Sequence, residues 1–221
     1  MKPLYDFGWL LSRFVGTVLM GGRVSGQQNA PRQGGFILAS NHISYLDPPL
    51  VGCYVRRRMH FFAKKELFAV PVLGWLVRNT QSHPVRRGGF DRQALETAVR
   101  LLKANKALTM FPEGTRGRDG EFLDPKAGIG RIAQEAGAPI LPAYMENSDR
   151  FKRCLLRKDR LRIRYGELIS DSWIGAQSPD KEGWQAVARE VMRRIGLLRD
   201  LEASGADEAT QSTAETQKRY E

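Results

Sequence analysis

A histidine followed five positions later by an aspartate is the first pair in this chain that could do chemistry. His42 and Asp47 lie in the stretch 41–48, NHISYLDP. A neutral imidazole is the side chain best placed near neutral pH to take a proton from a hydroxyl. A carboxylate on the other ring nitrogen would fix the tautomer and stabilise the imidazolium as it forms. The pair therefore predicts a general base and the group that orients it.

The spacing of this pair also constrains the backbone. Residues five apart on one helix point roughly 140° apart, so the two side chains meet only if the chain turns between them. Residues 35–39 predict a buried strand, and Asp47-Pro48 is typical of a helix start with proline at the first helical position. A strand-to-helix junction would supply the turn. The structural alternative is that Asp47 is only a helix N-cap.

A second candidate follows another predicted buried strand, residues 107–111. The loop 111–116 reads FPEGTR. Ligands of open α/β sheets bind just outside the carboxyl ends of the strands. In this loop Gly114, Thr115 and Arg116 combine backbone donors, a hydroxyl and a planar guanidinium, which suit a phosphate. The alternative is a tight turn with a solvated arginine.

Two further basic positions could hold an anion. Arg87 lies in VRRGG, residues 85–89, at the end of a predicted strand. Lys126 precedes a predicted helix over 127–137, and helix N-termini favour anions. Solvated basic turns are the alternative for both. The pattern GIGRIA at 128–133 follows a loop instead of a strand, so we predict helix packing against the sheet there and no dinucleotide site.

Strands and helices alternate from residue 23 onwards, which favours an α/β fold with a mostly parallel central sheet flanked by helices. The predicted strands are 35–39, 59–63, 81–85, 107–111, 139–144 and 161–165. The predicted helices are 48–58, 71–78, 90–105, 127–137 and 180–197. The domain predictions are an N-terminal helix over 1–22, one domain over 23–200 and a disordered polar tail over 201–221.

Residues 4–20 are apolar but contain Asp6, Ser12 and Arg13, and the uninterrupted part is too short to span a bilayer. They also lack the features of a signal peptide. Two alternatives remain: a helix buried on the domain, or an apolar helix in the membrane interface. In the second case Tyr5, Phe7 and Trp9 would lie at headgroup depth. The net charge of +11 favours an anionic membrane surface and therefore the interfacial helix.

Several other site types are not expected. Cys53 and Cys154 supply neither a disulfide framework nor a metal set, and are typical of reduced thiols in a cytosolic compartment. The three histidines are too widely spaced for a zinc site. Basic runs occur without any nucleic-acid-binding signature, so no nucleic acid partner is expected.

With these pieces in this order, the chain resembles the glycerolipid acyltransferase family typified by 1-acylglycerol-3-phosphate acyltransferase. Its first block is matched by N-H-x-S-x-x-D at 41–47, and its third by FPEGTR at 111–116 without a mismatch. Arg87 falls at the arginine of the second block, with looser flanks. Lys126 matches the basic position between the third and fourth blocks, and ILP at 140–142 resembles the fourth.

The resemblance implies transfer of a fatty acyl group from a thioester, on coenzyme A or acyl carrier protein, to a hydroxyl of lysophosphatidic acid, giving phosphatidic acid. His42 would take the proton from that hydroxyl and Asp47 would hold the ring, with no acyl-enzyme, no metal and no further cofactor. Among the substrate-binding residues, Glu113 would order an arginine or bond a glycerol hydroxyl. The others would hold the acceptor phosphate: Arg87, Gly114, Thr115, Arg116 and Lys126.

Because acceptor and product live in the bilayer, the resemblance also implies a peripheral enzyme on the cytoplasmic face of a membrane. The partners would be a lysophospholipid acceptor, acyl-CoA or acyl carrier protein, and the anionic membrane surface. Residues 23–200 would then be the acyltransferase domain. The alternatives are an acyltransferase for another lysophospholipid or an amino-acid lipid, a lipid-binding protein without turnover, and a basic nucleic-acid binder, against which the missing signatures argue.

Overall fold

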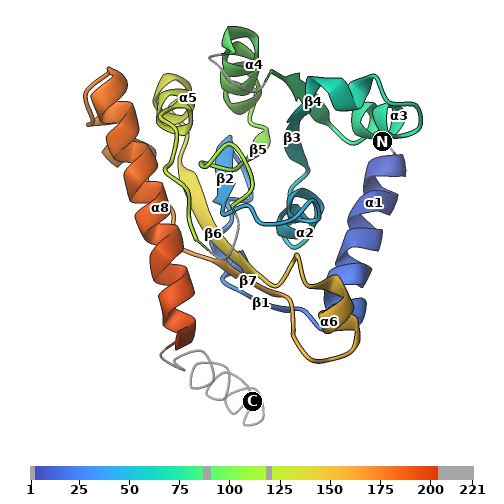
Figure 1. The fold of residues 1–221 in the computed structure, drawn as a ribbon. Helices are drawn as coiled ribbons and strands as arrows, with labels where there is room; N and C mark the ends of the chain where they lie inside the picture. Colours follow the sequence, from blue (N-terminus) through green and yellow to red (C-terminus); the bar gives the residue numbers. More distant parts are fainter. Residues whose placement is uncertain (1–2, 87–90, 118–120, 204–221) are drawn as a thin grey trace.

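The computed structural model describes residues 3–86, 91–117 and 121–203. Its centre is a seven-stranded sheet in the order β1-β7-β6-β2-β5-β3-β4 (Figure 1). Every neighbouring pair is parallel except β6 and β7. The strands are β1 (Arg23–Ser25), β2 (Phe36–Ser40), β3 (Met59–Lys64), β4 (Ser82–Val85), β5 (Ala107–Met110), β6 (Ile140–Glu146) and β7 (Arg162–Tyr165). The predicted α/β class is therefore confirmed.

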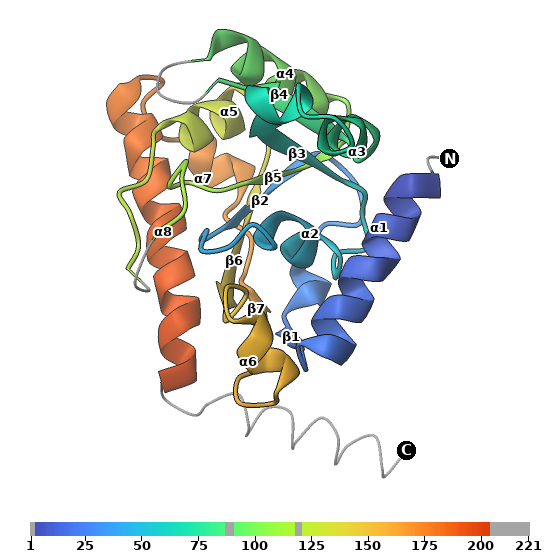
Figure 2. The ribbon, with the colours of Figure 1, turned by 45° about the vertical axis from the view of Figure 1, so that its right-hand side comes forward.

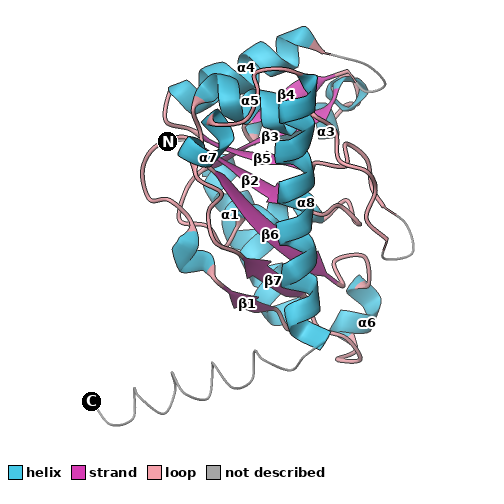
Figure 3. Cartoon of the chain, turned by 90° about the vertical axis from the view of Figure 1, so that its left-hand side faces the viewer, coloured by secondary structure: helices cyan, strands magenta, loops and turns pink. Residues whose placement is uncertain are grey.

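Helices cover both faces of the sheet (Figures 1 and 3). They are α1 (Pro3–Phe14), α2 (Asp47–Gly52), α3 (Leu73–Asn79), α4 (Arg92–Lys103), α5 (Gly128–Ala136), α6 (Phe151–Leu155), α7 (Asp171–Gly175) and α8 (Lys181–Ala203). A π-helical turn, Val15–Leu19, continues α1, and short 3-10 turns cover Gln27–Asn29 and Lys65–Phe68.

The central strand β2 shows why the chain folds into these layers. All five of its residues are buried, as expected for a strand with both faces covered. Ile37 and Ala39 pack into the core under α4, α5, α7 and α8. Phe36 and Leu38 point the other way, into the core beneath α1 and α2. Side chains alternate across a strand, so one short apolar run joins both cores and fixes β2 in the middle of the sheet.

Several predicted element boundaries differ from the structure. The helix predicted over 48–58 ends at Gly52, because the chain turns there to begin β3; a Cβ at this glycine would lie 3.2 Å from Met59. Conversely, α8 runs past its predicted end to Ala203, so the predicted tail 201–221 begins inside a helix and its remainder lies outside the described residues. The short elements β1, α6 and α7 were not predicted.

The pattern at 128–133 predicts a helix packed against the sheet, and Ile129, Ile132 and Ala133 of this helix do pack into the core on the sheet. Gly130 does not take part in this packing. Instead it faces α8, where a Cβ would overlap the backbone carbonyl oxygen of Trp184. The small residue is needed because two helices approach each other closely at this point.

The N-terminal helix α1 combines features of both alternatives from the sequence. Tyr5 is buried and its hydroxyl accepts a 2.7 Å hydrogen bond from the Met59 amide, so it is not available at headgroup depth. Trp9 packs against the core beneath α1, whereas Phe7 and Leu10 are 62% and 61% exposed. One face of α1 is thus packed and the other is apolar and exposed. Among the residues that the structure describes, no helix has the length and apolarity needed to cross a bilayer.

Candidate functional site

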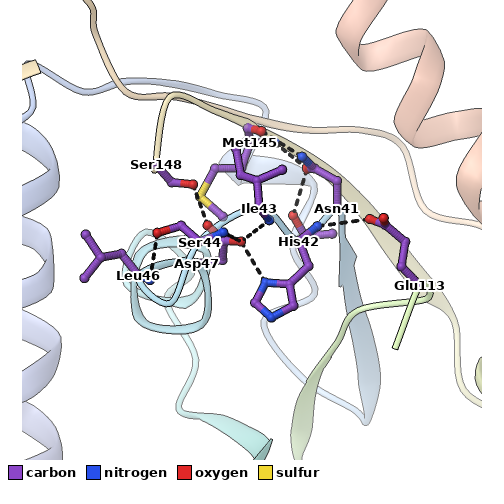
Figure 4. A network of polar contacts seen from close by, with 10 residues as sticks. Asn41, His42, Ile43, Ser44, Leu46, Asp47, Glu113, Met145 and Ser148 are labelled. Atoms are coloured by element: carbon purple, nitrogen blue, oxygen red, sulfur yellow. Dashed lines mark hydrogen bonds and ion pairs between the residues drawn. The ribbon is translucent and has the colours of Figure 1, made fainter. Parts of the chain in front are cut away.

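The carboxylate of Asp47 is the hub of the site (Figure 4). Its Oδ2 lies 2.8 Å from Nδ1 of His42 and accepts the amides of Ile43 at 2.6 Å and Ser44 at 2.8 Å. Its Oδ1 accepts the hydroxyl of Ser148 at 2.5 Å. All four partners lie outside the first turn of α2, so Asp47 orders the preceding loop and does not act as a simple helix cap. The predicted turn between the two residues is present.

The imidazole of His42 is held on two sides. With Nδ1–H directed at the Asp47 carboxylate, Nε2 is the ring nitrogen left to accept a proton. The ring stacks on Phe111, with centroids 4.1 Å apart and planes inclined by 19°. Both the tautomer and the ring plane are therefore fixed before any substrate arrives. His42 and Asp47 are buried, which strengthens their electrostatic interaction.

The backbone of His42 is clamped as well. Its N–H donates to Oε1 of Glu113 at 3.1 Å, and its C=O accepts the Gly117 amide at 2.8 Å. The second oxygen of Glu113 accepts the Leu123 amide at 3.0 Å. Burial raises the pKa of Glu113. Within the described part of the chain the hydrogen bonds of this carboxylate go to backbone amides, and no arginine is among its partners. It joins the loop 111–117 to the histidine.

The anion-binding candidates lie around this clamp. Gly114 has a φ of 70°, a backbone conformation that glycine adopts without strain. Lys126 covers it, because a Cβ at Gly114 would lie 3.0 Å from the lysine Nζ. The guanidinium of Arg116 stacks over the ring of Tyr45, 3.7 Å from its centroid. Thr115 is exposed between them. The structure thus gathers these four beside His42 and Asp47; Arg87 lies outside the described residues.

Some residues of the site were missed. Ser148 comes from the loop after β6, about a hundred positions beyond Asp47, and no local pattern connects the two. Asn41 was quoted only as part of a motif, yet it exchanges two hydrogen bonds with the backbone of Met145, at 2.8 and 2.9 Å. This pairing ties the catalytic loop to β6. Phe111 was quoted only as the last residue of the predicted strand 107–111 and the first of the FPEGTR motif, and neither pattern indicates that it stacks on His42.

Neither cysteine is an alternative nucleophile. Cys53 is buried, its thiol donates to the Leu50 carbonyl oxygen at 3.2 Å, and desolvation raises its pKa to about 12. Cys154 is also buried, and burial raises its pKa. Thiolates are the reactive form, so both groups are inert. Among the described residues, no group of histidine, cysteine and acidic side chains could hold a metal ion.

The geometry is that of a base with an orienting carboxylate, beside basic loops at the carboxyl ends of β2 and β5. Comparison with known proteins identifies the family. The family model described as "Acyltransferase" matches residues 22–146, more than half of the chain. The chain belongs to the acyltransferase family.

Relatives of this acyltransferase share most of its length. The 1-acyl-sn-glycerol-3-phosphate acyltransferase of Bacillus subtilis is 30% identical over 196 residues, which cover 88% of this chain and 96% of that protein. The enzyme of the same name from Streptococcus pneumoniae is 28% identical and matches over 74% of this chain and 60% of its own. The crystal structure of the 1-acyl-sn-glycerophosphate acyltransferase PlsC from Thermotoga maritima has a TM-score of 0.68 at 25% identity, covering 91% of this chain and 79% of that one.

Proposed function

We propose that this acyltransferase moves a fatty acyl group from a thioester donor, acyl-CoA or acyl carrier protein, to the free hydroxyl of lysophosphatidic acid, giving phosphatidic acid. The observation that carries the proposal is the buried His42–Asp47 pair, 2.8 Å apart, at the carboxyl edge of the sheet. The relatives named for this reaction support the choice of acceptor.

His42 is the general base of the proposed reaction. Its Nε2 takes the proton of the acceptor hydroxyl while the oxygen attacks the thioester carbonyl. The tetrahedral intermediate then collapses, the C–S bond breaks and the proton passes from the imidazolium to the departing sulfur. Asp47 stabilises the imidazolium during this exchange. The acceptor oxygen is itself the nucleophile, so the acyl group never resides on the protein.

The acceptor phosphate is bound by the glycine-rich and basic loops beside the histidine. Gly114 and Thr115 supply backbone and hydroxyl donors, and Arg116 and Lys126 supply positive charge. Arg87 is included by its place in the sequence motif. Holding the phosphate fixes the hydroxyl near Nε2, and such positioning contributes several kcal/mol, roughly 7–11 in the best intramolecular cases. Glu113 supports this binding by holding the 111–117 loop against His42.

The proposed location is the cytoplasmic face of a membrane, with α1 as the interfacial helix. Its exposed apolar face carries Phe7, Leu10, Leu11 and Phe14. An apolar helix together with a basic protein body makes the two-signal anchor that holds peripheral enzymes on anionic lipid. The net charge of +11 supplies the second signal. No nucleic acid partner is proposed.

The test is a mass-spectrometric acyl-transfer assay with purified protein. Vesicles would contain lysophosphatidic acid or other lysolipids, with acyl-CoA or acyl carrier protein as donor, and His42→Ala as the matched control. Phosphatidic acid that forms only with intact His42 is the expected result. Turnover of another lysolipid or an amino-acid lipid would retain the mechanism and replace the acceptor. No product with any pair would favour a lipid-binding protein without turnover.

A further inference from the structure

The segment between β3 and β4 exposes more apolar surface than a solvated crossover needs. We call residues 64–79 the apolar arm. Every residue from 69 to 73 is apolar and exposed, and the run continues with Trp75 and Leu76. Val72 is 83% exposed and Trp75 57%. Long runs of exposed apolar residues are uncommon on soluble surfaces and mark sites of interaction.

The backbone of the arm holds these side chains outward. Val72 has a φ of 51° and a ψ of −59°, and the Leu73 amide bonds the Pro71 carbonyl, which makes a γ-turn of the rare, strained kind. A β-branched residue adopts this conformation only where its surroundings impose it. The base of the arm is closed on itself, because Arg78 donates to the Phe68 carbonyl oxygen at 2.7 Å. The apolar tip is therefore presented by a built scaffold.

The arm begins at the edge of the sheet that carries the catalytic residues. β2, β5, β3 and β4 are neighbours and run in the same direction, so their carboxyl ends share one edge. His42 follows β2 and Phe111 follows β5 at this edge, and the arm starts at Lys64, the last residue of β3. Figure 2 shows α3 beside β3 and β4.

The charges of the arm identify what it contacts. The exposed bases Lys64, Lys65 and Arg78 flank the apolar run. The single acid, Glu66, pairs with Lys64 at 3.7 Å. Apolar and tryptophan side chains between basic residues are the composition of segments that lie in the interface of anionic bilayers. A partner protein would need an acidic surface beside its apolar one to neutralise the arm's excess positive charge. An anionic bilayer offers negative headgroups and an apolar interior together.

We propose that the apolar arm is a second membrane contact, inserting Val72 and Trp75 into anionic lipid beside the catalytic edge. The inference rests on the proposed function, which places the acceptor in a bilayer. It is separate from α1, since the two segments are far apart in sequence and pack against different parts of the fold. With two contacts, the catalytic edge has a fixed orientation on the lipid surface.

The test compares vesicle binding of three proteins at equal concentration. The double variant Val72→Ser/Trp75→Ser alters the arm. The matched control is Trp173→Ser, because Trp173 is also an exposed tryptophan, at 40%, but belongs to α7 and not to the arm. Vesicles of phosphatidylcholine with and without phosphatidylglycerol would be separated by flotation. We expect the arm variant to bind the anionic vesicles at least about tenfold more weakly than wild type. The control should bind like wild type.

A second measurement uses a variant that keeps the arm apolar, so its result does not depend on any loss of folding stability. Lipids brominated on the acyl chain quench tryptophans that enter the bilayer, so Trp75→Phe, which keeps the arm apolar, should retain binding and lose part of the quenching. Three results would contradict the proposed membrane contact. They are unchanged binding of the serine variant, tryptophan quenching that Trp75→Phe leaves intact, and a dimer of the wild-type protein that only the serine variant loses. Failure of the proposed function gives a different result: intact arm-dependent vesicle binding with no phosphatidic acid formed.

Discussion

At the scale of single residues, His42 is fixed through its backbone as well as its side chain. Glu113 and Gly117 hold its N–H and C=O, and Asp47 and Phe111 hold its ring. A general base is effective only when its nitrogen already lies within hydrogen-bond reach of the proton it takes. The loop 111–117 therefore positions the proposed base, in addition to its proposed contacts with the acceptor phosphate.

Replacing Asp47 by asparagine separates orientation from charge. The amide oxygen can still accept the amides of Ile43 and Ser44, and its NH₂ can face the Ser148 hydroxyl, so the loop remains bonded. The imidazolium, however, loses its negative partner. We expect kcat to fall on the order of 10³-fold or more, as when the carboxylate of a hydrolase triad is neutralised, with KM for the acceptor little changed.

The matched control is Asp6→Asn, which removes an exposed carboxylate that pairs with Arg58 at the surface. It should leave kcat at the wild-type value. Steady-state kinetics with lysophosphatidic acid measures both variants. Full activity of Asp47→Asn would contradict the role given to the His42–Asp47 pair.

Sequence reasoning could predict the site only where its parts are local. His42 and Asp47 are five positions apart, and the loop 111–116 follows one strand, so residue type and order were sufficient to propose them. The bond from Ser148 to Asp47 and the pairing of Asn41 with Met145 depend on β6 lying beside β2. Strand order is a property of the packed sheet, and it cannot be inferred from the local patterns of a single sequence.

At the scale of elements, helix α5 provides a matched pair of glycines, and only one of them lies against α8. A Cβ at Gly130 would overlap the Trp184 carbonyl oxygen, whereas a Cβ at Gly128 meets nothing within 4 Å. We expect Gly130→Ala to lower the free energy of unfolding by about 1–3 kcal/mol, because the two helices must separate. Gly128→Ala should leave it unchanged or raise it by up to about 1 kcal/mol, since alanine favours the helix.

Urea unfolding of both variants measures this difference. Equal stability of the two would mean that the helices repack without cost, and that Gly130 is not needed for their close approach.

The ion pairs of α8 give a stability that depends on pH. Hydrogen bonds from Arg193, and then from Arg194, lower the pKa of Glu190 from its ordinary 4.5 to about 2. Because the folded-state pKa is depressed, this contribution to the free energy of unfolding is complete above the unfolded value and is lost as pH falls from about 4.5 to about 2. Glu190→Gln should therefore melt below wild type at neutral pH, and the gap should close in that window.

Melting temperatures followed by circular dichroism from neutral pH to pH 2 test this prediction. The comparison is the difference between the two proteins, because other carboxylates titrate in the same range. A gap of constant size at every pH would assign the effect of the substitution to packing instead of charge.

Element boundaries were predicted less well than element types. Helix α2 stops early because Gly52 lies against Met59, and α8 runs past its predicted end where Leu198 lies against Gly166 and Arg199 stacks over the ring of Phe122. None of these contacts is local. The reversal of direction between β6 and β7 likewise depends on how the loop after β6 packs.

At the scale of the whole molecule, the exposed apolar residues are unevenly placed. Helix α1 presents Phe7 and Leu10 on the side of the sheet opposite α8 (Figure 1). Deleting the helix would also remove Tyr5 from the core, so substitution of the outer face is the cleaner test. Phe7→Ser/Leu10→Ser should weaken binding to anionic vesicles at least about tenfold, because each buried side chain contributes about 1.5–3 kcal/mol.

Leu197→Ser/Leu201→Ser is the control, since these leucines are exposed on α8. It should bind vesicles like wild type, and both variants should melt near the wild-type temperature. Equal losses in the two variants would mean that vesicle binding is not confined to the α1 side.

The burial of Cys53 and Cys154 has a consequence for the order of events in catalysis. A thioester can pass its acyl chain to a thiolate, and an acyl-cysteine formed in this way could acylate the acceptor in a second step. Here both cysteine thiols are buried and burial raises the pKa of each, so neither offers a thiolate that could take the acyl chain. The proposed direct transfer therefore requires donor and acceptor to be bound together, and double-reciprocal rate plots should intersect instead of running parallel.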